Sequence, residues 1–276
     1  MSARPTVATA LDHVVLLVTD LDRAAQGFSQ MGFVVTPESR HSIGSRNRCV
    51  MLADRSYIEL LDITERRGGD SDFHELMRRG GGLAGLAFRA DSLAQTRRRL
   101  AADGIPTREI QHFSRPVETG ERMELAEFAV CHIPLEVSGD YKLFYCDQLT
   151  PDRLWTDETT AHPNGADALV GVRLAVSEPL HFATSLSSVL GNRQSAQTET
   201  LEDAAGRRFG LEQRGPDTTG ATLELTVPDC QALADRLRAK SIDHRIAANG
   251  SLSIPATAVH DVRLVLSPQR PKEDTE

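Results

Sequence analysis

The stretch Leu11-Asp12-His13-Val14-Val15-Leu16-Leu17-Val18 reads as a β-strand that is apolar except near its start. A second stretch, Tyr57-Ile58-Glu59-Leu60-Leu61, reads as another apolar strand with one glutamate in its middle. Burying a carboxylate in such a run is costly unless a charged or hydrogen-bonding group meets it. The sequence therefore predicts a partner for Glu59, and either His13 itself or a metal held by both side chains would be one.

The first strand opens an order of elements that recurs along the chain. A helix is expected over residues 21–31, followed by strands at 33–35, 48–52 and 56–63. The same order of one strand, one helix and three strands begins again near residues 83, 168 and 221, with the third unit least regular. One unit leaves one sheet face open, so pairing two units would curl their sheets around a cavity. The predicted fold class is α+β, with four βαβββ modules paired into two open barrels.

These repeats predict two domains joined by a non-helical linker that is marked by prolines and an Asn-Gly turn. The expected divisions are an N-terminal domain at 1–149 with modules 9–64 and 80–149, a linker at 150–166, a C-terminal domain at 167–268 with modules 167–214 and 219–268, and a disordered tail at 269–276.

Composition and charge narrow the expected partners. The 276 residues are 40% hydrophobic and 25% charged, which suits a folded chain, and the formal net charge is -8. A negative net charge disfavours nucleic acid and anionic membrane surfaces. The sequence has no apolar run of membrane length and no apolar secretory core near its start. We expect a cytoplasmic protein with a small-molecule partner, and the oligomeric state stays open, a homodimer included.

Several stretches, in order along the chain, resemble the vicinal oxygen chelate superfamily, and within it the glyoxalase-like domain proteins. The stretches are Leu11–Val15 with Asp20-Leu21, Arg40-His41 with Gly44–Asn47, Tyr57–Leu60, Phe113–Val117, Phe144–Pro151 and His162–Ala166. The resemblance implies U-shaped barrels, a divalent metal (Fe, Mn, Ni or Zn) in the cleft, and substrates that chelate it through two adjacent oxygens.

The resemblance also implies which residues hold the metal. His13 matches the ligand position of the first strand, and Glu59 that of the fourth. In the second module Ala84 stands where His13 stands in the first, and Gln148 stands where relatives carry a histidine. The expected metal set is therefore His13, Glu59 and Gln148, which is incomplete, and a protein without a metal stays an alternative. His112 and His132 are alternative ligands from the second module.

Three functions remain open from the sequence. The favoured one is a metal-dependent lyase or isomerase in which His13 and Glu59 are catalytic, with a ring-cleaving dioxygenase as a less favoured variant. The second is a metal-free protein that binds an antibiotic or metabolite, and the third is a metal-free enzyme with His13 and Glu59 as an acid–base pair. The expected substrate contacts are His41, Asn47, Arg115, Tyr57 and Phe144, and the apolar cavity wall is expected to hold Phe33, Tyr57, Phe88, Phe144 and Tyr145.

Overall fold

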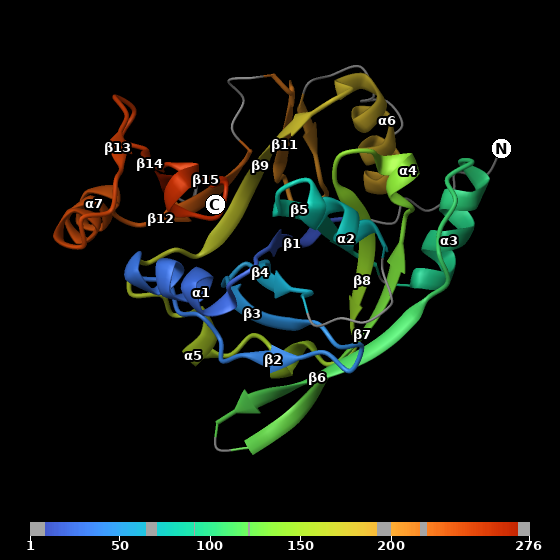
Figure 1. Ribbon diagram of the computed structural model, residues 1–276, viewed down its shortest axis with the longest axis horizontal. Helices are drawn as coiled ribbons and strands as arrows, with labels where there is room; N and C mark the ends of the chain where they lie inside the picture. The colour runs from blue at the N-terminus through green and yellow to red at the C-terminus, as the bar shows by residue number, and fades with distance from the viewer. Residues whose placement is uncertain are drawn as a thin grey trace, which may run out of the picture.

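The computed structural model describes residues 9–64, 71–90, 92–120, 122–191, 200–215 and 220–269. They form two β-sheets with helices packed beside them (Figure 1). An eight-stranded sheet has the order β2-β3-β4-β1-β5-β8-β7-β6, and a seven-stranded sheet has the order β10-β11-β9-β12-β15-β14-β13. The predicted α+β fold class of paired modules is confirmed.

Each module contributes its strands as a block. The first module holds β1 (Leu11–Leu17), α1 (Leu21–Gln30), β2 (Ser39–Arg40), β3 (Arg46–Met51) and β4 (Tyr57–Asp62), and α2 (Ser71–Arg78) follows it. The second holds β5 (Gly82–Arg89), α3 (Leu93–Ala102), β6 (Gln111–Thr119), β7 (Arg122–His132), α4 (Leu135–Ser138) and β8 (Lys142–Gln148). The third holds β9 (Ala168–Val176), α6 (Pro179–Leu190), β10 (Thr200–Glu202) and β11 (Arg208–Gln213). The fourth holds β12 (Ala221–Val227), α7 (Cys230–Ala239), β13 (Arg245–Ile246), β14 (Leu252–Ile254), a 3-10 helix (Ala256–Ala258) and β15 (Val262–Pro268).

Strand β1 lies at the centre of the eight-stranded sheet, parallel to β4 and antiparallel to β5. All seven of its residues are buried, which explains its nearly continuous apolar sequence. Val14 and Leu16 belong to a core that also contains Phe28 of α1, whereas Val15 belongs to a separate core on the inner side of the barrel. This alternation directs His13 toward the interior of the barrel.

Strands β2 and β6 are the two edges of this sheet, and hydrogen bonds to β6 from β2 and from the loop that follows it nearly close the barrel. The Ser39 hydroxyl donates to the Pro116 carbonyl at 2.6 Å, and the Ser42 amide donates to the Ser114 carbonyl at 2.8 Å. Pro116 has no amide hydrogen to offer, and a proline is tolerated on such an edge strand. The loop that carries His41 is thereby fixed against the second module.

The strand expected at residues 33–35 was wrong, because the second strand of the module is β2 at 39–40. Phe33 is nevertheless buried, and its ring lies 5.6 Å from the ring of Phe28 and 5.6 Å from that of His162. The apolar pattern that suggested a strand therefore reflects a loop packed into the core.

The linker was expected to contain no helix, and this prediction was wrong. A 3-10 helix spans Pro151–Arg153, and α5 spans Asp157–Thr160. Pro151 is at the first position of its helix, where the missing amide hydrogen costs nothing. Thr156 and Thr159 form a capping box at the start of α5.

His162 fixes the end of this linker to the first module. The Val34 amide donates to Nδ1 of His162 at 2.9 Å, so Nε2 carries the proton and donates to the Met51 carbonyl at 2.8 Å. Burial lowers the pKa of His162, although its hydrogen bond to Met51 acts in the opposite direction. A second proton would have to bind Nδ1, which would break the hydrogen bond that Nδ1 accepts from the Val34 amide.

Acidification is therefore expected to weaken the fold through His162. The pKa of His162 is lower in the folded chain than in the unfolded one. Its contribution to the free energy of unfolding is therefore complete above the ordinary histidine pKa of about 6.5, and it declines as the pH falls through the pKa of the folded state. Urea unfolding of wild type and His162→Gln at pH 7.5 and pH 5.5 checks this, and the stability gap between them should be smaller at pH 5.5. His181→Gln, which changes an exposed histidine, is the control. A stability difference between wild type and His162→Gln that is the same at both pH values would contradict the prediction.

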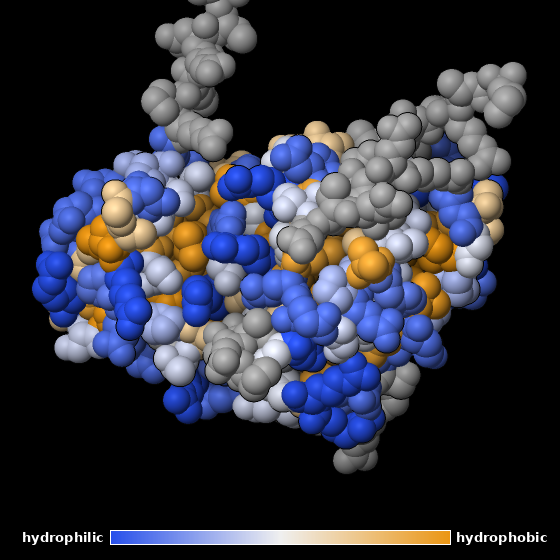
Figure 2. Space-filling view, turned by 90° about the horizontal axis from the view of Figure 1, so that it is seen from above, coloured by the Kyte–Doolittle hydropathy of each residue, from blue (hydrophilic) through white to orange (hydrophobic). Residues whose placement is uncertain are grey.

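The two halves of the chain share one continuous hydrophobic core. The ring of Phe88 lies 6.0 Å from that of Phe209, and the Tyr145 hydroxyl donates to the Val189 carbonyl at 2.5 Å. The face of the molecule shown in Figure 2 mixes hydrophilic residues with interrupted hydrophobic patches. None of the helices in the described ranges is long and apolar enough to cross a membrane.

Candidate functional site

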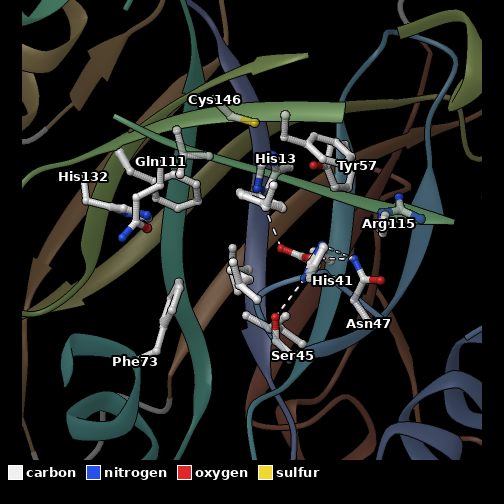
Figure 3. A pocket seen from close by; sticks show the side chains of 18 residues that line it. His13, His41, Ser45, Asn47, Tyr57, Phe73, Gln111, Arg115, His132 and Cys146 are labelled. Atoms are coloured by element: carbon white, nitrogen blue, oxygen red, sulfur yellow. Dashed lines mark hydrogen bonds and ion pairs between the residues drawn. The ribbon is translucent and has the colours of Figure 1, made fainter. Parts of the chain in front are cut away.

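A small cavity of about 60 Å³ lies inside the eight-stranded barrel. Both modules contribute to its wall, and polar side chains gather around His13 (Figure 3). The lining residues are His13, Val15, His41, Ile43, Ser45, Asn47, Tyr57, Glu59, Leu61, Phe73, Gln111, Phe113, Arg115, Phe128, Val130, His132, Phe144 and Cys146. The volume suits a small molecule or one end of a larger one.

Asp12 orients the ring of His13. Its Oδ1 atom lies 2.7 Å from Nδ1 of His13 and accepts a hydrogen bond from Gln148 at 2.8 Å, while its Oδ2 atom accepts one from Arg89 at 3.2 Å. Three donors suit an ionised carboxylate, so Nδ1 of His13 carries the proton and Nε2 keeps its lone pair. The Nε2 atom lies 3.8 Å from Oε2 of Glu59.

A break in the pairing of β1 with β5 accounts for the position of Asp12. Leu11 pairs with Phe88 and His13 with Ala87, so Asp12 is an extra residue in the ladder. Neighbouring side chains on a regular strand point to opposite faces, whereas a bulge turns a side chain away from that alternation. The irregularity lets the Asp12 carboxylate reach the ring that follows it in sequence.

Glu59 has partners on both of its oxygens. Asn47 Nδ2 donates to Oε1 at 2.7 Å, and His41 Nε2 lies 3.8 Å from the same oxygen. His41 Nδ1 is 2.8 Å from the Ser45 hydroxyl, and Asn47 Nδ2 is 3.3 Å from His41 Nε2. The predicted partner of Glu59 is thus a cluster of two imidazoles and one amide, drawn with dashed lines in Figure 3.

Aromatic rings hold His13 from the sides. Tyr57 stacks on it with ring centroids 4.3 Å apart, and Phe144 meets it edge-on at 5.5 Å. Burial raises the pKa of Tyr57 well above its usual value, and the nearby Asp12 carboxylate adds to the effect. Tyr57 therefore stays a neutral phenol at the wall of the cavity.

A family model of the glyoxalase-like domain matches residues 11–190, which is more than half of the chain. This chain belongs to the glyoxalase-like domain family. The match begins at the first residue of β1 and includes every residue that lines the cavity. The resemblance to the vicinal oxygen chelate superfamily is confirmed.

Several solved structures align with this glyoxalase-like chain. A hypothetical protein from Staphylococcus aureus aligns with a TM-score of 0.65 at 10% identity, over 95% of this chain and 100% of that chain. Methylmalonyl-CoA epimerase from Mycobacterium tuberculosis aligns with a TM-score of 0.41 at 21% identity, over 53% of this chain and 92% of that chain. The Streptomyces coelicolor epimerase in complex with 2-nitronate-propionyl-CoA gives 0.40 at 16% identity, over 52% and 96% of the two chains. No curated protein matches this chain.

Seven of the expected site residues line this cavity: His13, Glu59, His41, Asn47, Tyr57, Phe144 and Arg115. Gln148 does not join them, because its amide nitrogen donates to Asp12 behind His13. Ala84 is buried on the inner side of the barrel, where it offers no ligand atom. His132 lines the cavity beside Phe144, whereas His112 is exposed elsewhere on the surface.

The expected apolar wall was wrong in three of its five residues. Phe33, Phe88 and Tyr145 pack in the core on the helix side of the sheets. Phe144 and Tyr145 are neighbours on one strand, so their rings must point to opposite faces. Phe73, Phe113 and Phe128 form the aromatic wall instead.

Among the described residues, the ligand atoms of Asp12, His13 and Cys146 lie within 4.8 Å of one another. Asp12 already accepts three hydrogen bonds. Burial raises the pKa of the Cys146 thiol well above its usual value, with Asp12 and Glu59 adding to the effect. A protonated thiol is a poor ligand, so His13 is the member of this group with a lone pair to give.

The C-terminal sheet has a different arrangement around a partly buried carboxylate, that of Glu224 in β12. Its two oxygens pair with Arg173 at 2.9 Å and Arg208 at 3.5 Å. The carboxylate is therefore occupied by arginines, and the polar cluster around His13 belongs to the N-terminal barrel.

Proposed function

We propose that this glyoxalase-like protein is a divalent-metal-dependent enzyme of the lyase or isomerase type. Its substrate would be a small molecule with two adjacent oxygens. The observation that carries the proposal is the pairing of His13 Nε2 with Glu59 Oε2 across 3.8 Å, with the lone pair of His13 directed by Asp12. That separation is too long for a hydrogen bond and comparable to the spacing of two ligand atoms on one metal ion.

His13 and Glu59 would hold the metal. Imidazole nitrogen and carboxylate oxygen suit Zn, Mn, Fe or Ni, and the identity of the metal is left to experiment. A bound ion of this kind supplies Lewis-acid polarisation of substrate oxygens. Asp12 would act as the outer partner that fixes the ring of His13, as is usual for metal-binding histidines.

His41 is the residue we assign to proton movement. Its Nδ1 lies 2.8 Å from the Ser45 hydroxyl, and the amide nitrogen of Asn47, which can only donate, lies 3.3 Å from Nε2, so the lone pair of Nε2 lies on the side of Glu59 and Asn47. A buried neutral imidazole that is held at one nitrogen can take a substrate proton at the other. His41 approaches the oxygen of Glu59 that His13 does not face, so the two roles separate.

Tyr57, Phe144 and Asn47 would contact the substrate. The rings of Tyr57 and Phe144 hold His13 and would cover an apolar part of the ligand. The Oδ1 atom of Asn47 is buried and accepts no hydrogen bond within the described residues, so it can accept one from a substrate hydroxyl.

A metal-free binding protein is the second candidate. Asn47 already donates to Glu59 at 2.7 Å, and this bond stabilises the buried carboxylate without a metal. The same hydrogen bond also suits an enzyme in which His13 and Glu59 exchange a proton directly.

Calorimetric titration of chelator-treated protein with Mn²⁺, Ni²⁺, Zn²⁺ and anaerobic Fe²⁺ tests the proposal. We expect one equivalent of at least one of these ions to bind to wild type and not to His13→Gln. His181→Gln, which changes an exposed histidine, should bind as wild type does. Absence of saturable binding for all four ions would rule out the metal enzyme and favour the second candidate.

A further inference from the structure

The cavity contains a buried positive charge that no carboxylate balances at close range. Arg115 of β6 is 4% exposed and lines the cavity. Within the described part of the chain, no carboxylate oxygen lies within ion-pair distance of its guanidinium. The other most deeply buried arginine, Arg207, has such a partner, because Asp54 lies 2.7 Å from it.

The contacts of Arg115 are weak for a charged group. Its Nη2 atom lies 3.7 Å from Sγ of Cys49, and its guanidinium carbon lies 5.7 Å from the centre of the Phe128 ring. A thiol sulfur is a weak acceptor, and a ring face gives only a modest attraction. Leaving a buried cation with such partners costs stability, which proteins tolerate mainly at functional sites.

The position of Arg115 relates it to the polar cluster. Cys49 also receives a long hydrogen bond from Asn47, whose amide lies 3.8 Å from the sulfur. Arg115 and Asn47 are therefore neighbours at one side of the cavity, and Figure 3 shows Gln111 and His132 at the other side. A ligand held at Arg115 would have its remaining part near Glu59 and His13.

We propose that the cavity takes a small carboxylate, whose anionic group is held by Arg115. The inference rests on the proposed function only in placing the substrate in this same cavity. An arginine can donate two parallel hydrogen bonds to one carboxylate, and exclusion of water strengthens this pair. The substrate class is thus a monocarboxylic acid with a short aliphatic or aromatic frame, which the walls of Phe113 and Phe128 would cover.

A carboxylate fits the site better than a phosphate. A single guanidinium matches one negative charge, whereas a phosphate dianion would bring a second charge close to Glu59.

Calorimetric titration with two matched pairs of probes tests the proposal, in chelator-treated protein so that no metal contributes. The pairs are propionate with propionamide and benzoate with benzamide, and inorganic phosphate is the comparison anion. We expect at least one carboxylate to bind about 10-fold or more tightly than its amide and than phosphate. We expect Arg115→Met to weaken the binding of that carboxylate about 10- to 100-fold, and Arg115→Lys to weaken it less.

Thermal unfolding without ligand separates a binding role from a structural one. Arg115→Met should melt at or above the temperature of wild type, because it removes an unbalanced buried charge. Exposed Arg122→Gln, from the adjoining β7, is the control for loss of an arginine and should bind as wild type does.

Three results would overturn the inference: equal binding of acid and amide, tighter binding of phosphate, or unchanged carboxylate binding in a folded Arg115→Met variant. These results are independent of the metal titration of His13→Gln. Metal binding without carboxylate binding would refute this inference alone, and carboxylate binding without metal binding would refute the metal enzyme alone.

Discussion

Replacing Arg207 by methionine is expected to lower the free energy of unfolding by about 3–5 kcal/mol. Arg207 is buried between the two halves of the chain, where its guanidinium lies 2.7 Å from an oxygen of Asp54 and 3.6 Å from an oxygen of Asp203. Its Nε donates to the Leu169 carbonyl at 2.9 Å. Methionine fills similar space, but it leaves the carboxylate of Asp203 buried without its cation.

The same network supports the strand that carries the candidate site. Oδ2 of Asp203 accepts a hydrogen bond from the Leu11 amide at 2.8 Å, across 192 positions in sequence. Leu11 is the first residue of β1, directly before Asp12. Disturbing Asp203 should therefore loosen the start of β1, and we expect metal binding to weaken along with stability.

Urea unfolding followed by circular dichroism measures the effect of Arg207→Met. Arg208→Met is a matched control, because that neighbouring arginine is about half exposed and contacts Glu224 only at 3.5 Å. Its loss should cost at most about 1 kcal/mol. Equal destabilisation by the two variants would show that the buried network contributes no more than a surface ion pair.

The sequence predicted the centre of the candidate site because a polar residue inside an apolar strand stands out. His13 and Glu59 were found in this way, and the structure places both at the cavity. The alternation of side chains could also have separated Phe144 from Tyr145, since adjacent strand residues face opposite sides. Aromatic residues therefore predict a cavity wall only after each one is assigned to a face of its strand.

Other features depend on contacts that no local pattern carries. Asp12 reaches His13 only because β1 is irregular against β5, and the bulge depends on the partner strand. The partners of Arg207 come from distant segments, and their identity follows from how the two sheets pack. Gln148 is a further example of a position that depends on distant contacts. The family resemblance implied that it is a metal ligand, whereas its side-chain amide donates a hydrogen bond to Asp12.

The Asp12→Asn variant is expected to weaken divalent metal binding about 10- to 100-fold. An amide in place of the carboxylate can present its N–H to Nδ1 of His13, which lies 2.7 Å away in the wild type. The imidazole would then carry its proton on Nε2, the atom that faces Glu59. A protonated nitrogen has no lone pair for a metal, although the ring keeps its place between Tyr57 and Phe144.

Calorimetric titration of Asp12→Asn with the ion that binds wild type most tightly measures this loss. Asp22→Asn is the control, because that carboxylate is exposed and pairs with Arg48 on the surface. A cooperative melting transition would establish that the Asp12 variant is folded, so that weaker binding reports on His13 and not on unfolding. If the folded variant binds the ion as tightly as wild type, Asp12 does not set the protonation of His13, and the carboxylate serves only to stabilise β1.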